Sequence, residues 1–144
     1  MDRDRSPDVA VYVVWSSQLG AEERHVPAAA ALIPDSRAAH FWDAGQLVGK
    51  AFQPIVGTPV PSWDVWMVFD RQARWNGEIP PRPAWWEHQL HDMPPERHLD
   101  PERFARKARA LEASNPPRSH STRGDLMRAP WPAGKLVSFR RRVG

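Results

Sequence analysis

The chain has 144 residues, of which 41% are hydrophobic and 26% are charged, and both values are typical of one folded domain. It contains no cysteine, which excludes disulfides, thiolate zinc sites, iron–sulfur clusters and a cysteine nucleophile. The net charge of +3 is unevenly placed. Residues 115–144 hold seven Lys and Arg and one acid, whereas residues 1–114 hold 13 basic and 16 acidic residues. A basic tail is therefore attached to a mildly acidic body.

Two residue types are unusually frequent. The 16 prolines predict many breaks between elements, and the 8 tryptophans predict a core or groove built from large rings. The N-terminus has no apolar signal segment, and no apolar run approaches the ~20 residues that span a bilayer. We therefore expect a cytoplasmic protein that does not enter a membrane.

The first elements read as a strand and a helix. Residues 9–15 form a continuous β-branched and aromatic run, typical of a strand buried on both faces. Residues 22–33 predict a helix with acids in its first turn. Pro27 has to begin this helix rather than lie inside it, because proline lacks the N–H of an interior position.

A second strand and helix follow. Residues 38–42 predict a short strand, and Asp43 after it is a plausible N-cap. Residues 44–53 carry apolar side chains on one face, which predicts an amphipathic helix. We expect Pro54 to end it.

The next segments predict a hairpin and a short helix. Residues 63–69 read as a strand, and residues 73–75 as its antiparallel return before the turn dipeptide Asn76-Gly77. Residues 84–91 predict a short helix whose tryptophans dock onto the sheet.

The last regular element predicted is a helix over residues 101–114. Asp100 is a sound N-cap, and Pro101 stands at the favoured first position. From residue 115 onward, proline, serine, glycine and arginine predict a disordered tail, residues 115–144.

This order resembles the C-terminal portion of the thioredoxin fold, in which a strand and helix precede a proline, a hairpin and a closing helix. It is similar in particular to a group of uncharacterised bacterial thioredoxin-like proteins. The resemblance implies an α/β domain, residues 8–114, with an incomplete thioredoxin-like sheet (strand, helix, strand, hairpin, helix) and an added C-terminal helix. It covers about residues 9–91 and depends on four segments: residues 11–15, 40–43, 63–66 and 85–90.

The chain departs from this family at its chemistry. Such proteins begin with a strand and a Cys-x-x-Cys pair at a helix N-terminus, where the thiol pKa is lowered, and the family would be read as thiol–disulfide oxidoreductases. Only eight residues precede Val9 here, too few for a strand and a crossover helix. Two alternatives follow. Either strands 9–15 and 63–69 close directly onto each other, or the chain is a fragment whose sheet a partner chain completes.

We predict from this a truncated thioredoxin-like domain with no oxidoreductase activity and no cofactor. No recognisable catalytic constellation suggests another enzyme. The alternative is a small binding module that uses a Trp-rich groove for a peptide or its basic tail for nucleic acid.

The resemblance also suggests a groove. Pro61, just before Trp63, would take the place of the cis-proline that shapes the substrate groove of thioredoxin-like proteins. The alternative is an ordinary trans loop proline. Asp64, which follows Trp63, could accept a proton from a redox pair. Since the chain has no redox pair, we interpret Asp64 as a paired or solvated carboxylate.

Three histidines are the candidates for a metal site. His88 and His91 are three residues apart on the predicted helix, with His98 nearby, and such a pair can bind a divalent metal. No thiolate or motif-spaced carboxylate accompanies them, so we interpret them as surface histidines and predict no metal.

The basic tail interleaves arginines with Trp131 and Phe139, a pattern that can hold nucleic acid through phosphates and stacking. No nucleic-acid-binding fold motif accompanies it. We therefore interpret the tail as solvated and expect no nucleic-acid partner.

Overall fold

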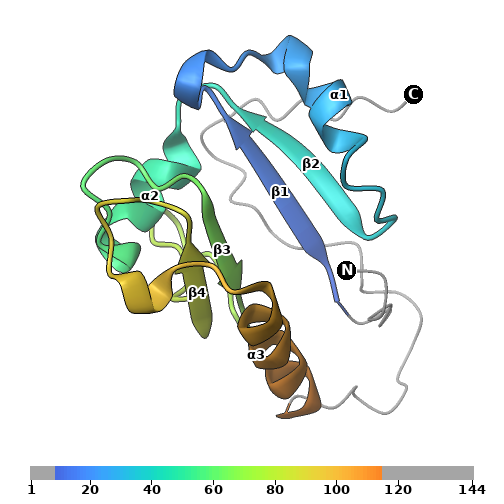
Figure 1. Ribbon diagram of the computed structural model, residues 1–144, viewed down its shortest axis with the longest axis vertical. Helices are drawn as coiled ribbons and strands as arrows, with labels where there is room; N and C mark the ends of the chain where they lie inside the picture. Colours follow the sequence, from blue (N-terminus) through green and yellow to red (C-terminus); the bar gives the residue numbers. More distant parts are fainter. Residues whose placement is uncertain (1–8, 115–144) are drawn as a thin grey trace. The chain divides into compact units, whose positions relative to one another are not determined.

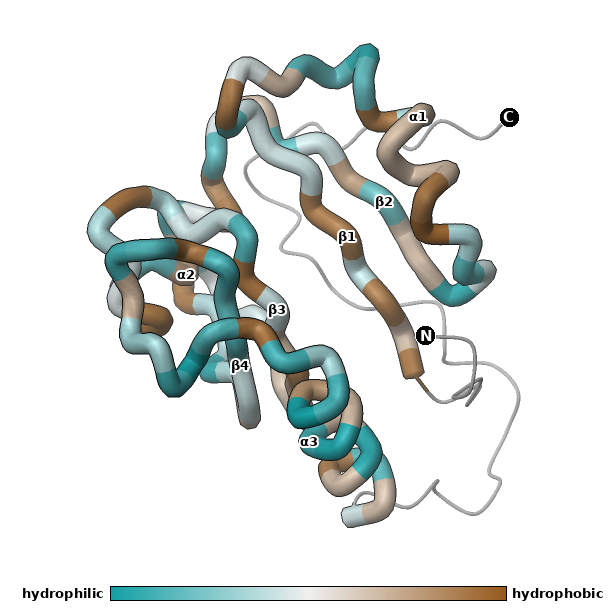
Figure 2. The backbone as a smooth tube through the Cα atoms, in the orientation of Figure 1, coloured by the Kyte–Doolittle hydropathy of each residue, from teal (hydrophilic) through white to brown (hydrophobic). Residues whose placement is uncertain are grey.

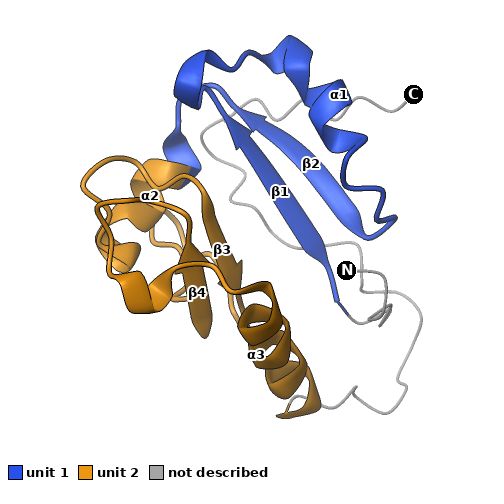
Figure 3. Cartoon of the chain, in the orientation of Figure 1, with its two compact units in different colours: residues 1–48, 136–144 blue, residues 49–135 orange. Residues whose placement is uncertain are grey.

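The computed structural model describes residues 9–114, a mixed α/β chain whose contacts form two compact units (Figures 1 and 3). The described part of unit 1 is residues 9–48, and that of unit 2 is residues 49–114. The predicted tail, residues 115–144, lies outside the described residues. No helix in the described range is long and apolar enough to cross a membrane.

Unit 1 contains a parallel pair of strands, β1 (Val11–Ser16) and β2 (Ala38–Asp43). The sequence predicted both strands, and each predicted end lies within two residues of the observed end. The connection between them is less regular than predicted. In place of one helix over residues 22–33 it holds three short helical segments: Gln18–Gly20, Glu23–His25 and α1 (Val26–Ala30). Pro27 lies in the first turn of α1, as its missing N–H requires.

Burial along β1 differs from the prediction. The strand alternates between half-buried and exposed positions, and Tyr12 and Val14 are 57% and 38% exposed. Part of the hydrophobic stretch coloured brown along β1 in Figure 2 is therefore exposed to solvent. An apolar run alone cannot distinguish a strand covered on both faces from one covered on a single face.

Helix α2 (Leu47–Val56) begins three residues later than predicted. The buried Asp43 carboxylate explains the shift, since it accepts the N–H of Leu47 at 2.9 Å and that of Val48 at 2.8 Å. Gln46 has a positive φ of 54°, so the chain turns there before the helix starts.

The prediction that Pro54 ends α2 was wrong, because Pro54 lies inside the helix. It is in the last turn, where its missing N–H removes a single backbone bond. Termination comes at Gly57, whose φ is +80° and whose N–H donates to the Gln53 carbonyl at 2.8 Å. This is the left-handed C-terminal cap that glycine favours.

Unit 2 contains an antiparallel pair, β3 (Val65–Val68) and β4 (Trp85–His88). The predicted return strand 73–75 and helix 84–91 were both wrong. Asn76 and Ile79 bond to each other around Gly77, so the expected turn forms without a strand before it. Two adjacent tryptophans begin β4, and large aromatics favour strands.

Helix α3 (Pro101–Ser114) has the predicted bounds. Asp100 caps it as predicted, since its Oδ1 accepts the N–H groups of Glu102 at 3.0 Å and Arg103 at 2.9 Å. An aromatic cluster lies elsewhere in unit 2, around the buried Phe52, whose ring centroid is 5.9 Å from Phe69 and 5.5 Å from Trp75.

Among the described residues, β1 pairs with β2 and β3 pairs with β4. Direct closure of strands 9–15 and 63–69 onto each other stays a prediction, since each strand belongs to a different unit. The mixed α/β class is confirmed.

Candidate functional site

A buried carboxylate joins β4 to α3 within unit 2. The Glu87 side chain is fully buried. Its Oε1 accepts hydrogen bonds from Trp85 Nε1 at 2.9 Å and from Arg103 Nε at 2.7 Å, and its Oε2 accepts the backbone N–H of Asp100 at 2.9 Å. Arg103 also donates to the His98 carbonyl at 2.6 Å. The start of α3 is therefore tied to the strand by charged hydrogen bonds.

These contacts set the protonation state of the network. Burial raises the pKa of Glu87, but the hydrogen bonds from Arg103, the Asp100 backbone and Trp85 outweigh it, so the net pKa lies below the ordinary value of 4.5. The Arg103 backbone N–H lowers the pKa of Asp100, and Glu87 raises the pKa of Arg103. Glu87 is thus ionised at neutral pH, and both of its oxygens serve structural bonds rather than proton transfer.

His88 lies next to Glu87 and has a structural environment as well. Its Nδ1 accepts the Leu90 N–H at 3.0 Å, so the proton must be on Nε2, which donates to the Pro94 carbonyl at 3.0 Å. The ring is fully buried, which corrects the prediction of a surface histidine on a helix. His91 is exposed, and the His98 ring is 5.9 Å from that of His88. Both ring nitrogens of His88 make structural hydrogen bonds, so the candidate pair His88 and His91 does not have the geometry of a metal site here.

Two cations pack against the tryptophans that begin β4. The Arg97 guanidinium is 4.2 Å from the ring centroid of Trp85 and 4.9 Å from that of Trp86, and it donates to the Trp86 carbonyl at 3.2 Å. Lys107 Nζ, from α3, is 4.6 Å from the Trp85 centroid. All three distances to the ring centroids fall within the range of cation–π attraction.

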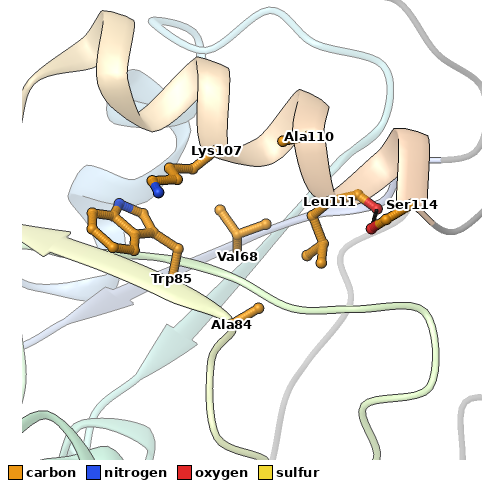
Figure 4. Close-up of a pocket in the computed structure, with 7 residues that line it drawn as sticks. All are labelled: Val68, Ala84, Trp85, Lys107, Ala110, Leu111 and Ser114. Atoms are coloured by element: carbon orange, nitrogen blue, oxygen red, sulfur yellow. Dashed lines mark hydrogen bonds between the residues drawn. The ribbon is translucent and has the colours of Figure 1, made fainter.

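A pocket of about 290 Å³ opens beside Trp85, between α3 and the start of β4. Figure 4 shows Lys107 at one end of it and Ser114 at the other, with apolar side chains between them. Its remaining lining residues are apolar: Val68, Ala84, Trp85, Ala110 and Leu111. The pocket thus combines an apolar wall with one ammonium group.

The predicted groove residues lie elsewhere in unit 2. All peptide bonds of the described residues are trans, so Pro61 is the ordinary trans loop proline of the second alternative and not a cis-proline. The loop that contains Pro61 is anchored by a hydrogen bond between the hydroxyls of Thr58 and Ser62 at 2.9 Å. Trp63 is half-buried, and Asp64 is exposed, as interpreted. The structure does not bring Pro61 or Trp63 into the pocket beside Trp85.

Unit 1 presents a different surface. Tyr12 and Val14 share one face of the parallel pair, and their register places Phe41 on the same face. The rings of Tyr12 and Phe41 stack at 6.3 Å. On the opposite face, Trp15 Nε1 donates to His40 Nδ1 at 3.1 Å. No strand among the described residues other than β2 pairs with β1.

Sequence reasoning missed Glu87, Arg97 and Lys107 as neighbours of Trp85. These contacts do not follow from the helix predicted over residues 84–91, because only a strand places Trp85 and Glu87 on one face. Asp100 was predicted only as a helix cap, and Arg103 only as part of the helix over residues 101–114. Their shared contact with Glu87 spans up to 16 residues of sequence and leaves no local pattern.

In comparisons with protein-family models, curated proteins and solved structures, nothing matches the chain.

Proposed function

We propose that the chain is the back part of a thioredoxin-like domain that binds a partner polypeptide and performs no thiol chemistry. The order of elements supports the fold. A strand precedes helical segments, a second strand and α2, and an antiparallel pair and a helix follow. With β4 as the second strand of the hairpin, α3 becomes the closing helix that the resemblance requires.

The binding proposal depends on two features of β1, its second edge and its exposed face. A strand paired on one side leaves alternate N–H and C=O groups free on its other edge. Parallel sheets are normally covered on both faces, and two strands alone are marginally stable. Beside this edge, Tyr12 and Val14 are exposed. An added strand would satisfy the backbone, and its apolar side chains would cover this face.

The partner is therefore an extended apolar segment of another polypeptide, which pairs with β1 by strand addition. Specificity would come from the partner's side chains that lie next to Tyr12, Val14 and Phe41. Successive side chains of a strand point to opposite faces, so only every second residue of the partner would contribute. Fully burying side chains of this size contributes roughly 1.5–3 kcal/mol each.

Site-specific photocrosslinking in the native cells tests this proposal. A benzophenone amino acid at position 12 should crosslink to one polypeptide, through an extended apolar segment, and Val14→Lys on the same face should abolish the product. The control is the same probe at position 32, since Leu32 is 83% exposed in the same unit but lies outside the sheet. The purified partner should then protect the β1 amides from hydrogen exchange.

Equal crosslinking at positions 12 and 32 would contradict the proposal. So would a partner that leaves the exchange of β1 unchanged, because strand addition must protect amides of that strand.

A further inference from the structure

The pocket of unit 2 has its own chemistry, which does not depend on any partner at β1. Lys107, Ala110, Leu111 and Ser114 are spaced at i, i+3, i+4 and i+7, so they form one stripe along α3. The stripe faces the aromatic ring of Trp85 together with Val68 (Figure 4). Since α3 rises about 1.5 Å per residue, Lys107 and Ser114 are separated by roughly 10 Å along the helix.

Lys107 provides a charge that the protein does not neutralise within the described residues. Its ammonium stacks on Trp85, and no described carboxylate pairs with it. The nearby acids have other partners. Glu87 is fully buried and accepts three hydrogen bonds, and Asp100 caps α3. The donors of Lys107 therefore remain available to an anion from solvent.

We propose that this pocket binds a small carboxylate with an apolar body. The carboxylate pairs with Lys107, and the apolar body lies along Leu111 toward Ser114. A single ammonium suits one carboxylate, whereas a phosphate group favours a fork of donors such as arginine supplies.

The pocket is open to solvent, so its volume indicates how large a part of a ligand it can hold. Its 290 Å³ lies just below the ~300–1,000 Å³ of drug-sized sites, and at ~30 Å³ for each water-sized group it holds about ten such groups. An aromatic acid has this size, and so does the C-terminal residue of a peptide that ends in a large apolar side chain.

The test is an NMR titration of the whole chain with 3-phenylpropionate, which has about that many non-hydrogen atoms. We expect shifts at the Trp85 indole N–H and at the Val68 methyl groups, with a Kd on the order of 1 mM, as expected for so small a ligand. The neutral 3-phenylpropionamide should bind at least about tenfold more weakly, since it lacks the charge that pairs with Lys107. Salt should weaken the acid's binding and leave the amide's unchanged.

Lys107→Met keeps the apolar stem and removes the charge, so it should weaken binding of the acid about tenfold and leave the amide unchanged. The matched control is Arg106→Met, which removes one positive charge from an exposed neighbour on the same helix and should change the Kd by less than about twofold. Equal binding of acid and amide, equal effects of the two variants, or no shift at Trp85 well above 1 mM ligand would overturn the proposal.

The same titration with N-acetyl-Gly-Gly-Phe distinguishes the two sources of this chemistry. Tighter binding of the peptide identifies a polypeptide C-terminus as the ligand, and tighter binding of the free acid identifies a small molecule. Either result supports an apolar carboxylate as the ligand, provided that Lys107→Met weakens its binding.

Discussion

The two units stabilise their two-stranded sheets differently. In unit 2, the buried Glu87 accepts three hydrogen bonds that tie β4 to α3. In unit 1, a half-buried hydrogen bond from Trp15 to His40 links β1 to β2, while Tyr12 and Val14 beside it stay exposed. Unit 2 therefore satisfies its buried Glu87 internally, whereas unit 1 leaves Tyr12 and Val14 exposed on the face that we propose another polypeptide covers.

Breaking the Glu87 network should have the largest effect. Glu87→Gln leaves Arg103 without its buried anionic partner, so we expect a loss of about 3 kcal/mol in the free energy of unfolding. Urea denaturation measures this loss. The control is Glu102→Gln, because the Glu102 side chain is 90% exposed and 3.9 Å from Arg106, a pair that contributes little. Equal urea midpoints for the two variants would show that the network does not stabilise unit 2.

Lowering the pH should also reduce the free energy of unfolding. The folded pKa values of Glu87 and Asp100 are lowered, so their stabilisation is present above the ordinary values of 4.5 and 3.8 and is lost as pH falls through the folded values. We expect the urea midpoint to fall between about pH 5 and pH 2 as these two carboxylates become protonated. In Glu87→Gln the slope over this range should be shallower, and an unchanged slope would argue against the assignment.

Gly49→Ala tests the packing of α2 in unit 2. A Cβ on Gly49 would lie 2.6 Å from the Ser62 carbonyl oxygen, and backbone cannot move aside as a side chain can. The Gly49 carbonyl also accepts the Ser62 N–H at 2.9 Å. We expect a loss of about 2 kcal/mol in urea denaturation. Gly45→Ala is the control in unit 1, where the new Cβ meets only the flexible Leu47 side chain, and it should cost less.

Trp15→Phe should have the smallest effect of these changes. It removes the hydrogen bond to His40 Nδ1, which is half-buried and neutral, so we expect a loss of about 1 kcal/mol. A loss as large as that of Glu87→Gln would reverse the comparison between the two units.

The sequence predicts the elements whose signals are local. The β-branched run of β1, the cap at Asp100 and the start of α3 at Pro101 all depend on neighbouring residues. The sequence does not predict β4, because two tryptophans followed by Glu87 and His88 are too short a segment to distinguish a strand from a helix. Tertiary bonds decide it, since β4 pairs with β3 and its Glu87 meets Arg103 far along the chain.

The candidate sites follow the same rule. His88 and His91 share a face only in a helix, and the strand that forms instead buries His88 against the Pro94 carbonyl. Lys107 belongs to the predicted helix over residues 101–114, and it is exposed there. Its place beside Trp85 requires the packing of α3 on β4, which no local pattern describes.

Residue-resolved hydrogen exchange on the purified chain shows whether the outer edge of β1 is open. We expect the amides of Val11–Ser16 that point away from β2 to exchange nearly as fast as unstructured amides. The bonded amides of Trp85–His88 should be protected by orders of magnitude. Protection of every β1 amide at the level of β4 would contradict this expectation, because the edge proposed to receive a partner strand would already be closed.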